Sequence, residues 1–154
     1  MIVLFWSVMG ASIGSALLPL INIEAILALA VSQEPDQAVV LVVAATIGQM
    51  VGKLAWYWGG ANLDRATWVH RHLEKPKPKA ALAKWHERAE GRPLFTAGLL
   101  FVSAFVGLPP YAVTAVLAGV LRVNFAVFLL TGLLGRGLRF WLVVEGVHSL
   151  LELW

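Results

Sequence analysis

The sequence predicts an all-α integral membrane protein, and three observations carry this prediction. Hydrophobic residues make up 59% of the 154-residue chain and charged residues only 14%, whereas soluble domains are about 45–50% apolar and about a quarter charged. The apolar residues are gathered into runs long enough to cross a bilayer. Two of these runs contain a proline near the middle, which breaks a helix without ending the apolar stretch. We therefore expect a single membrane domain over residues 1–154.

The first apolar run, residues 2–31, is too long for one simple span. Pro19 breaks it, and the polar residues Asn22 and Glu24 follow. A polar break at membrane depth persists only where protein or water covers it. The run is therefore predicted to form two short helices that meet at the break, as a re-entrant hairpin. A basic region before the apolar run is lacking, so no signal peptide is predicted.

Residues 38–60 form the first continuous spanning helix, and a glycine pair is predicted to end it. The motif Gly48-x-x-x-Gly52 allows a second helix to approach closely, either from this chain or from another copy in a homo-oligomer. Lys53 is interpreted as snorkelling to the interface, with lining a site as the alternative. Tyr57 lies between two tryptophans in an aromatic belt that marks a membrane interface.

The segment 61–92 is polar and basic, with eight Lys or Arg against four acidic residues. The positive-inside rule places it in the cytoplasm, and the acidic loop 32–37 then lies on the opposite side. Residues 79–90 are predicted to form an amphipathic helix along the lipid headgroups. His70 and His72 have no third ligand at a suitable spacing, so no metal site is predicted.

The second apolar run, residues 93–121, breaks at Pro109 and Pro110 and ends at Arg122. The last spanning helix is predicted over residues 124–146. It contains two small residues suited to helix packing, Gly132 and Gly135.

Two arginines lie inside this last helix. Arg136 is about 18 Å of helical rise from the helix start, near the middle of a bilayer core of about 30 Å. Arg139 follows at i+3, on the same face. Each arginine at this depth costs about 2.5–3.5 kcal/mol in contact with lipid. They are therefore predicted to face inward, with snorkelling as the alternative for Arg139.

The chain repeats its own order of elements. A proline break, a return arm and a spanning helix occur in residues 1–60 and again in 93–154. Residues 52–58 match residues 135–141 in five of seven positions by residue type. Each half contains an odd number of crossings, so the second half is inverted. Inverted repeats with broken helices are a transporter design, with the site near the midplane where the breaks meet.

The predicted site binds an anion. Arg136 and Arg139 attract a phosphate, and helix N-termini at the two breaks add positive dipole ends. Glu24 is interpreted as a protonatable partner of the arginines, or alternatively as a structural N-cap paired with one of them. Hydrogen bonds to the ligand are expected from Tyr111 and Thr114, with packing within the hairpin as the alternative for Tyr111. Asn22 lies at the helix N-terminus of the first break. Secondary positions are Lys53, Tyr57 and Arg122.

Several motifs resemble the DedA superfamily, also called the VTT or SNARE-associated domain, in its shorter VTT branch. They are Pro-x-x-x-x-Glu (19–24), Gly-x-x-x-Gly…Tyr (48–57), Glu90-Gly91, the proline tip (109–110), Ala118-Gly119, Phe128 and Gly-Arg-x-x-Arg-Phe (135–140). The resemblance implies a lipid transporter or scramblase, a class that includes bacterial flippases for undecaprenyl phosphate. It further implies a bacterial plasma membrane and dependence on the proton-motive force, with Glu24 at the position of the family's acidic residue.

The leading hypothesis is therefore a transporter or scramblase for a phosphate-bearing lipid. The first alternative is a membrane scaffold or assembly protein with a structural Glu–Arg network. The second alternative, an enzyme acting on lipid phosphates, is disfavoured because no histidine or second carboxylate clusters with Glu24. The expected partners are anionic lipid headgroups. Nucleic acid is not expected as a partner, because the net charge of +3 comes from one local cluster. No cofactor is expected.

Overall fold

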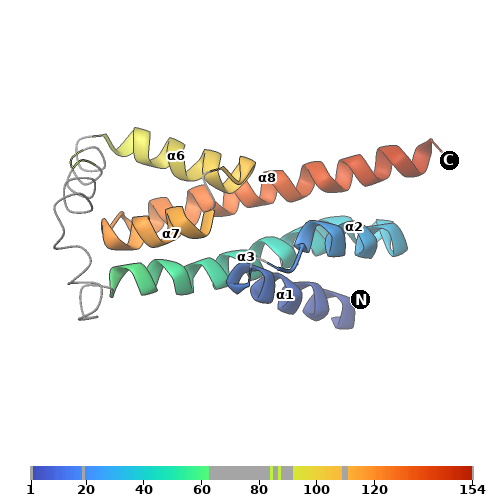
Figure 1. The fold of residues 1–154 in the computed structure, drawn as a ribbon. Helices are drawn as coiled ribbons and strands as arrows, with labels where there is room; N and C mark the ends of the chain where they lie inside the picture. Colours follow the sequence, from blue (N-terminus) through green and yellow to red (C-terminus); the bar gives the residue numbers. More distant parts are fainter. Residues whose placement is uncertain are drawn as a thin grey trace. The chain divides into compact units, whose positions relative to one another are not determined.

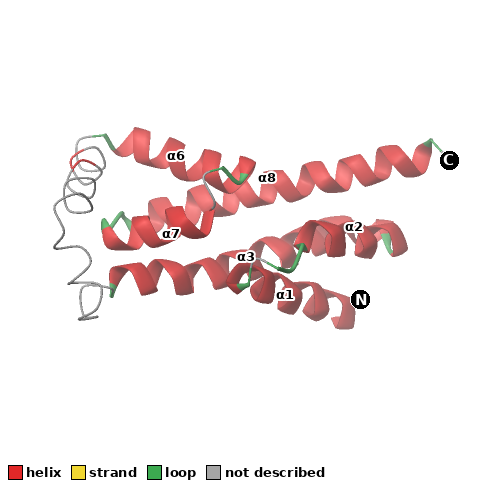
Figure 2. Ribbon diagram, in the orientation of Figure 1, coloured by secondary structure: helices red, strands yellow, loops and turns green. Residues whose placement is uncertain are grey.

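The computed structural model describes residues 2–18, 20–62, 84, 87, 92–108 and 111–153, and these residues form helices and loops without strands (Figures 1 and 2). In order, the elements are α1 (Ile2–Leu17), α2 (Ile23–Gln33), the short 3₁₀ helix η1 (Pro35–Gln37), α3 (Ala38–Ala61), α6 (Pro93–Val106), α7 (Tyr111–Val120) and α8 (Phe125–Glu152). Several sequence predictions lie outside the described residues: the amphipathic helix except for Lys84 and Glu87, the two histidines, and the tip residues Pro19, Pro109 and Pro110.

The chain forms two compact units. Unit 1 comprises Met1–Lys53 and Gly132–Trp154, and unit 2 comprises Leu54–Thr131. The two long helices, α3 and α8, contribute a segment to each unit. Each unit also holds one pair of shorter helices joined by a break, α1 with α2 and α6 with α7, and the members of each pair contact each other.

The first break occurs where the sequence predicts it. Asn22 is the N-cap of α2, and its side-chain oxygen accepts hydrogen bonds from the N–H groups of Glu24 at 3.1 Å and Ala25 at 3.3 Å. These bonds satisfy donors that have no partner inside the helix. The alternative in which Glu24 caps α2 is therefore wrong, because Asn22 holds the cap and Glu24 lies in the first turn.

The core of unit 1 forms behind this break. Leu27 and Val31 of α2 are fully buried, and they belong to the same cluster as Leu41 of α3 and Phe140 and Val144 of α8. Burying side chains of this size stabilises the unit by about 1.5–3 kcal/mol each. The cluster fixes α2 against both long helices.

The glycine pair of α3 packs against α1 of the same chain. A Cβ atom on Gly48 would lie 2.6 Å from the Met9 carbonyl oxygen, and one on Gly52 would overlap the Cβ of Ala16. Only glycine permits this backbone approach. The pair serves packing within the chain, so its interpretation as a contact between copies is wrong.

In unit 2, the residues that follow the C-terminal ends of α6 and α7 have positive φ angles. Gly107 ends α6 with φ 84°. Arg122 follows α7 with φ 50°, and hydrogen bonds run from its N–H to the Gly119 oxygen and from Val123 N–H to the Ala118 oxygen. This is the Schellman pattern that closes a helix. Arg122 is exposed there.

A second close crossing joins the end of α3 to α7. A Cβ atom on Gly60 would overlap the Val116 carbonyl, and one on Gly119 would overlap the Tyr57 carbonyl. The helix ends at Ala61, one residue after the glycine pair that was predicted to end it. Gly60 is also required for packing at this crossing.

The last helix is longer than predicted. It starts after Asn124, whose side-chain oxygen accepts from Ala126 N–H at 2.9 Å, and it runs to Glu152. Residues 147–152 contain neither proline nor glycine, so nothing ends the helix at Gly146. Arg139 therefore lies near the middle of this helix rather than close to its far end.

Two of the described helical segments are long and apolar enough to cross a membrane, Pro35–Ala61 with 27 residues and Phe125–Glu152 with 28 residues. At 1.5 Å per residue each is about 40 Å long, which exceeds a hydrocarbon core of about 30 Å. The other apolar helices have 10–16 residues. They are too short to span such a core alone.

The α3–α7 crossing yields a prediction with a matched control in the same helix. Gly60→Ala should destabilise the protein by about 1–3 kcal/mol because the new methyl group meets backbone. Gly59→Ala should be neutral or stabilising by up to about 1 kcal/mol, because nothing lies within 4 Å of its Cβ position. Thermal unfolding of both variants in detergent measures the difference. Equal melting temperatures would contradict the crossing.

Candidate functional site

The central feature of unit 1 is an ion pair between Glu24 and Arg139. Arg139 Nε donates to Glu24 Oε1 at 2.5 Å, and the two side chains are 28% and 32% exposed for Arg139 and Glu24 respectively. The pair joins the first turn of α2 to the middle of α8, across 115 positions of sequence. A carboxylate in a first helical turn also interacts favourably with the helix dipole. Glu24 is thus held by two independent electrostatic effects.

Lys53 is buried rather than snorkelling. Only 6% of its surface is exposed, and its Nζ donates to the Ala16 carbonyl oxygen at 2.8 Å. Ala16 lies in the last turn of α1, where the helix dipole is negative and carbonyls lose their intrahelical partners. The interpretation of Lys53 as snorkelling is wrong because the neighbouring Gly52 brings this helix end directly beside it.

The polar seam between α1 and α3 continues from Lys53 toward the N-terminal part of α3. The Gln49 amide donates to the Ser12 carbonyl oxygen at 3.3 Å and to the Ser15 hydroxyl, and the Ser12 hydroxyl donates to the Ala45 carbonyl oxygen at 2.5 Å. All three side chains are buried. Sequence reasoning missed this seam, although the glycine pair that brings the two helices together was a usable signal.

Arg136 lies on α8, three residues before Arg139. It is half-buried. Spacing of i, i+3 keeps Arg136 and Arg139 on one side of α8. Arg139 is bound to the carboxylate of Glu24, so the snorkelling alternative for Arg139 is wrong. Gly132 and Gly135, which precede Arg136 on α8, are buried.

The predicted residues of the second hairpin bond within unit 2. The Thr114 hydroxyl lies 2.9 Å from the Ser103 hydroxyl and donates to the Tyr111 carbonyl oxygen at 3.0 Å. Tyr111 is buried and stacks on Phe128. These groups stabilise the second hairpin. The sequence also predicts that this hairpin faces Arg136 and Arg139, and that stays a prediction.

Tyr57 is also a packing residue. Its hydroxyl donates to the Val123 carbonyl oxygen at 2.6 Å, and its ring stacks on Phe128 with centroids 4.7 Å apart. Tyr57 is buried, whereas the flanking Trp56 and Trp58 are exposed. The aromatic belt therefore consists of the two tryptophans, and Tyr57 fixes the end of α3 to the start of α8.

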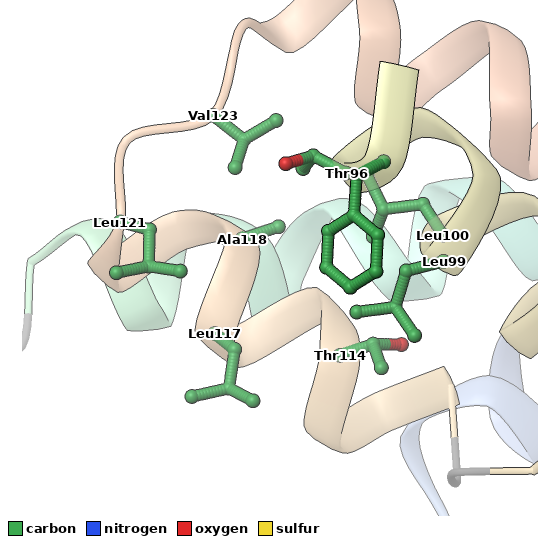
Figure 3. A pocket seen from close by; sticks show the side chains of 9 residues that line it. Thr96, Leu99, Leu100, Thr114, Leu117, Ala118, Leu121 and Val123 are labelled. Atoms are coloured by element: carbon green, nitrogen blue, oxygen red, sulfur yellow. The ribbon is translucent and has the colours of Figure 1, made fainter. Parts of the chain in front are cut away.

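Each unit also contains an apolar cavity. In unit 2, a space of about 30 Å³ lies between α6 and α7; its walls include Thr96, Leu99, Leu100, Leu117 and Ala118 (Figure 3). In unit 1, a more open groove of about 330 Å³ is lined by α3 and α8, including Val43, Leu133 and Trp141. The lining hydroxyl of Thr46 donates to the Val42 carbonyl oxygen. Such walls suit hydrocarbon rather than polar ligands.

No group of three or more His, Cys, Asp or Glu suited to a metal ion occurs among the described residues.

The geometry can be compared with known proteins. A family model described as the VTT domain matches residues 18–148, which include Glu24, Lys53 and both arginines. The chain belongs to the VTT domain family. This is the family of the DedA membrane proteins, as the sequence motifs indicated. Comparison with curated proteins and with solved structures found no match.

Family membership and the two membrane-length helices agree. The VTT domain chain is an integral membrane protein. Its charged residues on α3 and α8 therefore lie in helices long and apolar enough to cross a membrane, where an ionised side chain is costly without a partner. The family comprises membrane proteins proposed as transporters or flippases.

The ion pair yields a prediction. Glu24→Gln should destabilise the protein by about 1.5–3 kcal/mol, because it leaves Arg139 without its carboxylate. Glu24→Gln combined with Arg139→Gln should cost less than the sum of the two single changes, since neither charge is then left alone. Unfolding free energies of the four proteins complete the cycle. Strict additivity would show that the pair does not couple α2 to α8.

Proposed function

We propose that this VTT domain protein is a transporter or scramblase that moves a phosphate-bearing lipid, a phospholipid or polyprenyl phosphate, across the bilayer. One observation carries the proposal: the ion pair of Glu24 and Arg139, with Arg136 beside it, in the middle of a membrane-length helix. Ionisable residues inside membrane helices are rare and mark ion or substrate pathways. The family described above supports the same class of function.

The charges favour an anionic headgroup. Arg136 and Arg139 present two guanidinium groups on one side of α8, against the single carboxylate of Glu24. A guanidinium group binds phosphate oxygens through paired N–H donors, more strongly than it binds neutral acceptors. The groove between α3 and α8 offers apolar walls to the lipid tails. A phosphate-bearing lipid satisfies both features.

Glu24 supplies a mechanism for exchange. In the absence of lipid its carboxylate neutralises Arg139; an arriving phosphate competes for the same guanidinium. Protonation of Glu24 removes the negative charge that holds Arg139, so proton uptake would favour phosphate binding. This step couples the lipid site to the proton gradient without any covalent chemistry.

The orientation of the chain is part of the proposal. The eight basic residues of segment 61–92 support a cytoplasmic location for this segment, in a bacterial plasma membrane, by the positive-inside rule. On the opposite side, Glu34 and Asp36 are exposed between α2 and α3. The charge difference between the two connections supports this orientation.

A second candidate function is a membrane scaffold. Glu24 and Arg139 tie α2 to α8, and Lys53 ties α3 to α1, so the same charges also serve as tertiary crosslinks. A structural network of this kind predicts loss of folding, rather than loss of transport, when one member is removed.

Transport in proteoliposomes tests the proposal. Arg139→Met and Arg136→Met should each reduce translocation of a labelled phospholipid or polyprenyl phosphate at least about tenfold, a loss of about 1.4 kcal/mol, because each removes a phosphate-binding charge. Arg92→Met, at an exposed arginine before α6, is the matched control and should leave the rate unchanged. Glu24→Gln should abolish the dependence of the rate on a pH gradient.

Two outcomes would decide against the proposal. Unchanged translocation in well-folded Arg136→Met and Arg139→Met proteins removes the arginine site. Absence of translocation by the folded wild-type protein, together with loss of folding in both variants, favours the scaffold.

A further inference from the structure

The apolar groove between α3 and α8 in unit 1 contains a position where a side chain is absent. Leu133, Gly137 and Trp141 line the groove from α8. Their spacing of four residues places them in one row along the helix. Gly137 is the middle member of this row, so two large side chains flank a position that has none. The row therefore contains a notch one side chain deep.

Packing does not require a glycine at position 137. A Cβ atom there would lie 3.8 Å from the nearest atoms of the Thr46 side chain, which is an ordinary van der Waals distance. At Gly48 and Gly52, by contrast, a Cβ atom would overlap atoms of α1. The helix does not favour Gly137 either, since glycine is a poorer helix former than alanine in a helix interior. What Gly137 provides is open space.

The walls of the groove are hydrocarbon. The Thr46 hydroxyl donates to the Val42 carbonyl oxygen at 2.7 Å, so this donor is already used within its own helix. Val43 and Trp141 are 46% and 40% exposed, and the groove therefore opens on the outer surface of two membrane-length helices. In the core of a bilayer, such a surface meets the hydrocarbon chains of lipids.

The shape of the notch favours an acyl chain over a second helix. An α-helix with its side chains is about 10–12 Å across, and close approach of two helices in a membrane requires small residues along the contact face. Here Leu133 and Trp141 stand on either side of Gly137 and hold a second backbone away. A polymethylene chain is one methylene group wide, and it brings no polar group that the apolar walls would leave without a partner.

The groove lies at the same level of α8 as the two arginines. Gly137 is one residue from Arg136 and two from Arg139, which corresponds to about 1.5 Å and about 3 Å of helical rise. A lipid whose headgroup lies at either membrane surface reaches the middle of the core only with the ends of its chains. A lipid whose phosphate is bound at Arg139 brings the first part of its chain to this level.

We propose that the groove between α3 and α8 holds one acyl chain of the transported lipid while its phosphate is bound at Arg139, and that the missing side chain of Gly137 leaves room for this chain. The inference deepens the proposed function by assigning a site to the hydrocarbon part of the substrate, and it rests on that function for the presence of the headgroup. The size of residue 137 then determines whether the chain fits.

Photochemical labelling in phosphatidylcholine nanodiscs tests the groove. The full-length protein is reconstituted with phosphatidic acid that carries a photoreactive diazirine in the middle of one acyl chain, and the labelled residues are identified by mass spectrometry. Labelling of Leu133 should saturate as the fraction of the probe rises. Labelling of Leu142, which is exposed on α8 and does not line the groove, should rise linearly, as contact with bulk lipid does.

Variants with a filled notch provide the decisive comparison. Gly137→Leu should lower the labelling of Leu133 at least about tenfold. Gly146→Leu makes the same change on the same helix, where nothing lies within 4 Å of the Cβ position, and should leave the labelling of Leu133 unchanged. If Gly137→Leu does not fold, Val43→Trp carries the test, because it narrows the groove from the exposed side of α3. Unchanged labelling in the filled variant, at a normal melting temperature, overturns the proposal.

A second probe separates the transported lipid from other occupants. Diacylglycerol with the same photoreactive chain lacks the phosphate, so it should label Leu133 at least about tenfold less than phosphatidic acid does. Equal labelling by the two probes overturns the proposal, since any chain of the bilayer then fills the groove. Absence of labelling by both also overturns it, and a dimer that Gly137→Leu converts to a monomer would then identify a second copy as the occupant.

Translocation measured on the same proteins distinguishes this inference from the proposed function. If phosphatidic acid labels the groove saturably and Gly137→Leu removes the labelling, but the wild-type protein moves no lipid, the chain site stands and transport fails. If the wild-type protein moves lipid and a folded Gly137→Leu protein moves it at the same rate, transport stands and the chain site fails.

Discussion

The ion pair between Glu24 and Arg139 is the interaction on which the arrangement of unit 1 depends. Both groups lie on apolar helices, where an isolated charge is costly. The ion pair lowers this cost for both side chains. Because Glu24 is in the first turn of α2, the pair also fixes the position of the break that precedes it, and the Asn22 cap orients that turn. The buried cluster around Leu27 and Phe140 then packs α2 against α8. The ion pair, the Asn22 cap and the buried cluster therefore all fix the same position of α2 against α8.

The two helix pairs fill equivalent places in the sequence with different chemistry. After the first break comes a carboxylate bound to an arginine; after the second come the stacked ring of Tyr111 and the hydroxyl pair of Ser103 and Thr114. Neutral hydroxyls satisfy each other inside a helix pair at little cost, whereas a buried carboxylate requires a cation. Unit 1 therefore carries the ionic chemistry, while the described residues of the second hairpin serve mainly to keep their own helices together.

Local signals explain what could be predicted from the sequence. The break between α1 and α2, the break between α6 and α7, and the bounds of α3 to within one residue follow from residue type and spacing, and the structure confirms them. The pairing of Glu24 with one of the two arginines was also predicted, and it is formed with Arg139. The partner of Lys53 did not follow, because the position of a residue along a helix does not reveal which neighbour lies beside it. Lys53 looked close to a helix end, yet Gly52 brings the last turn of α1 against it. The end of α8 was missed because Gly146 weakens a helix without breaking it.

The numbers of opposite charges separate a structural network from a binding site. A network that serves only stability needs each cation matched by an acid, since unmatched charge in an apolar helix lowers stability. Among the described buried and half-buried residues of unit 1, Lys53, Arg136 and Arg139 accompany one carboxylate, Glu24. Lys53 is compensated by the carbonyl end of α1 and Arg139 by Glu24, so part of the charge is balanced inside the chain. Under the proposed function, a phosphate that arrives as substrate competes with Glu24 for Arg139, which a purely structural pair would not require.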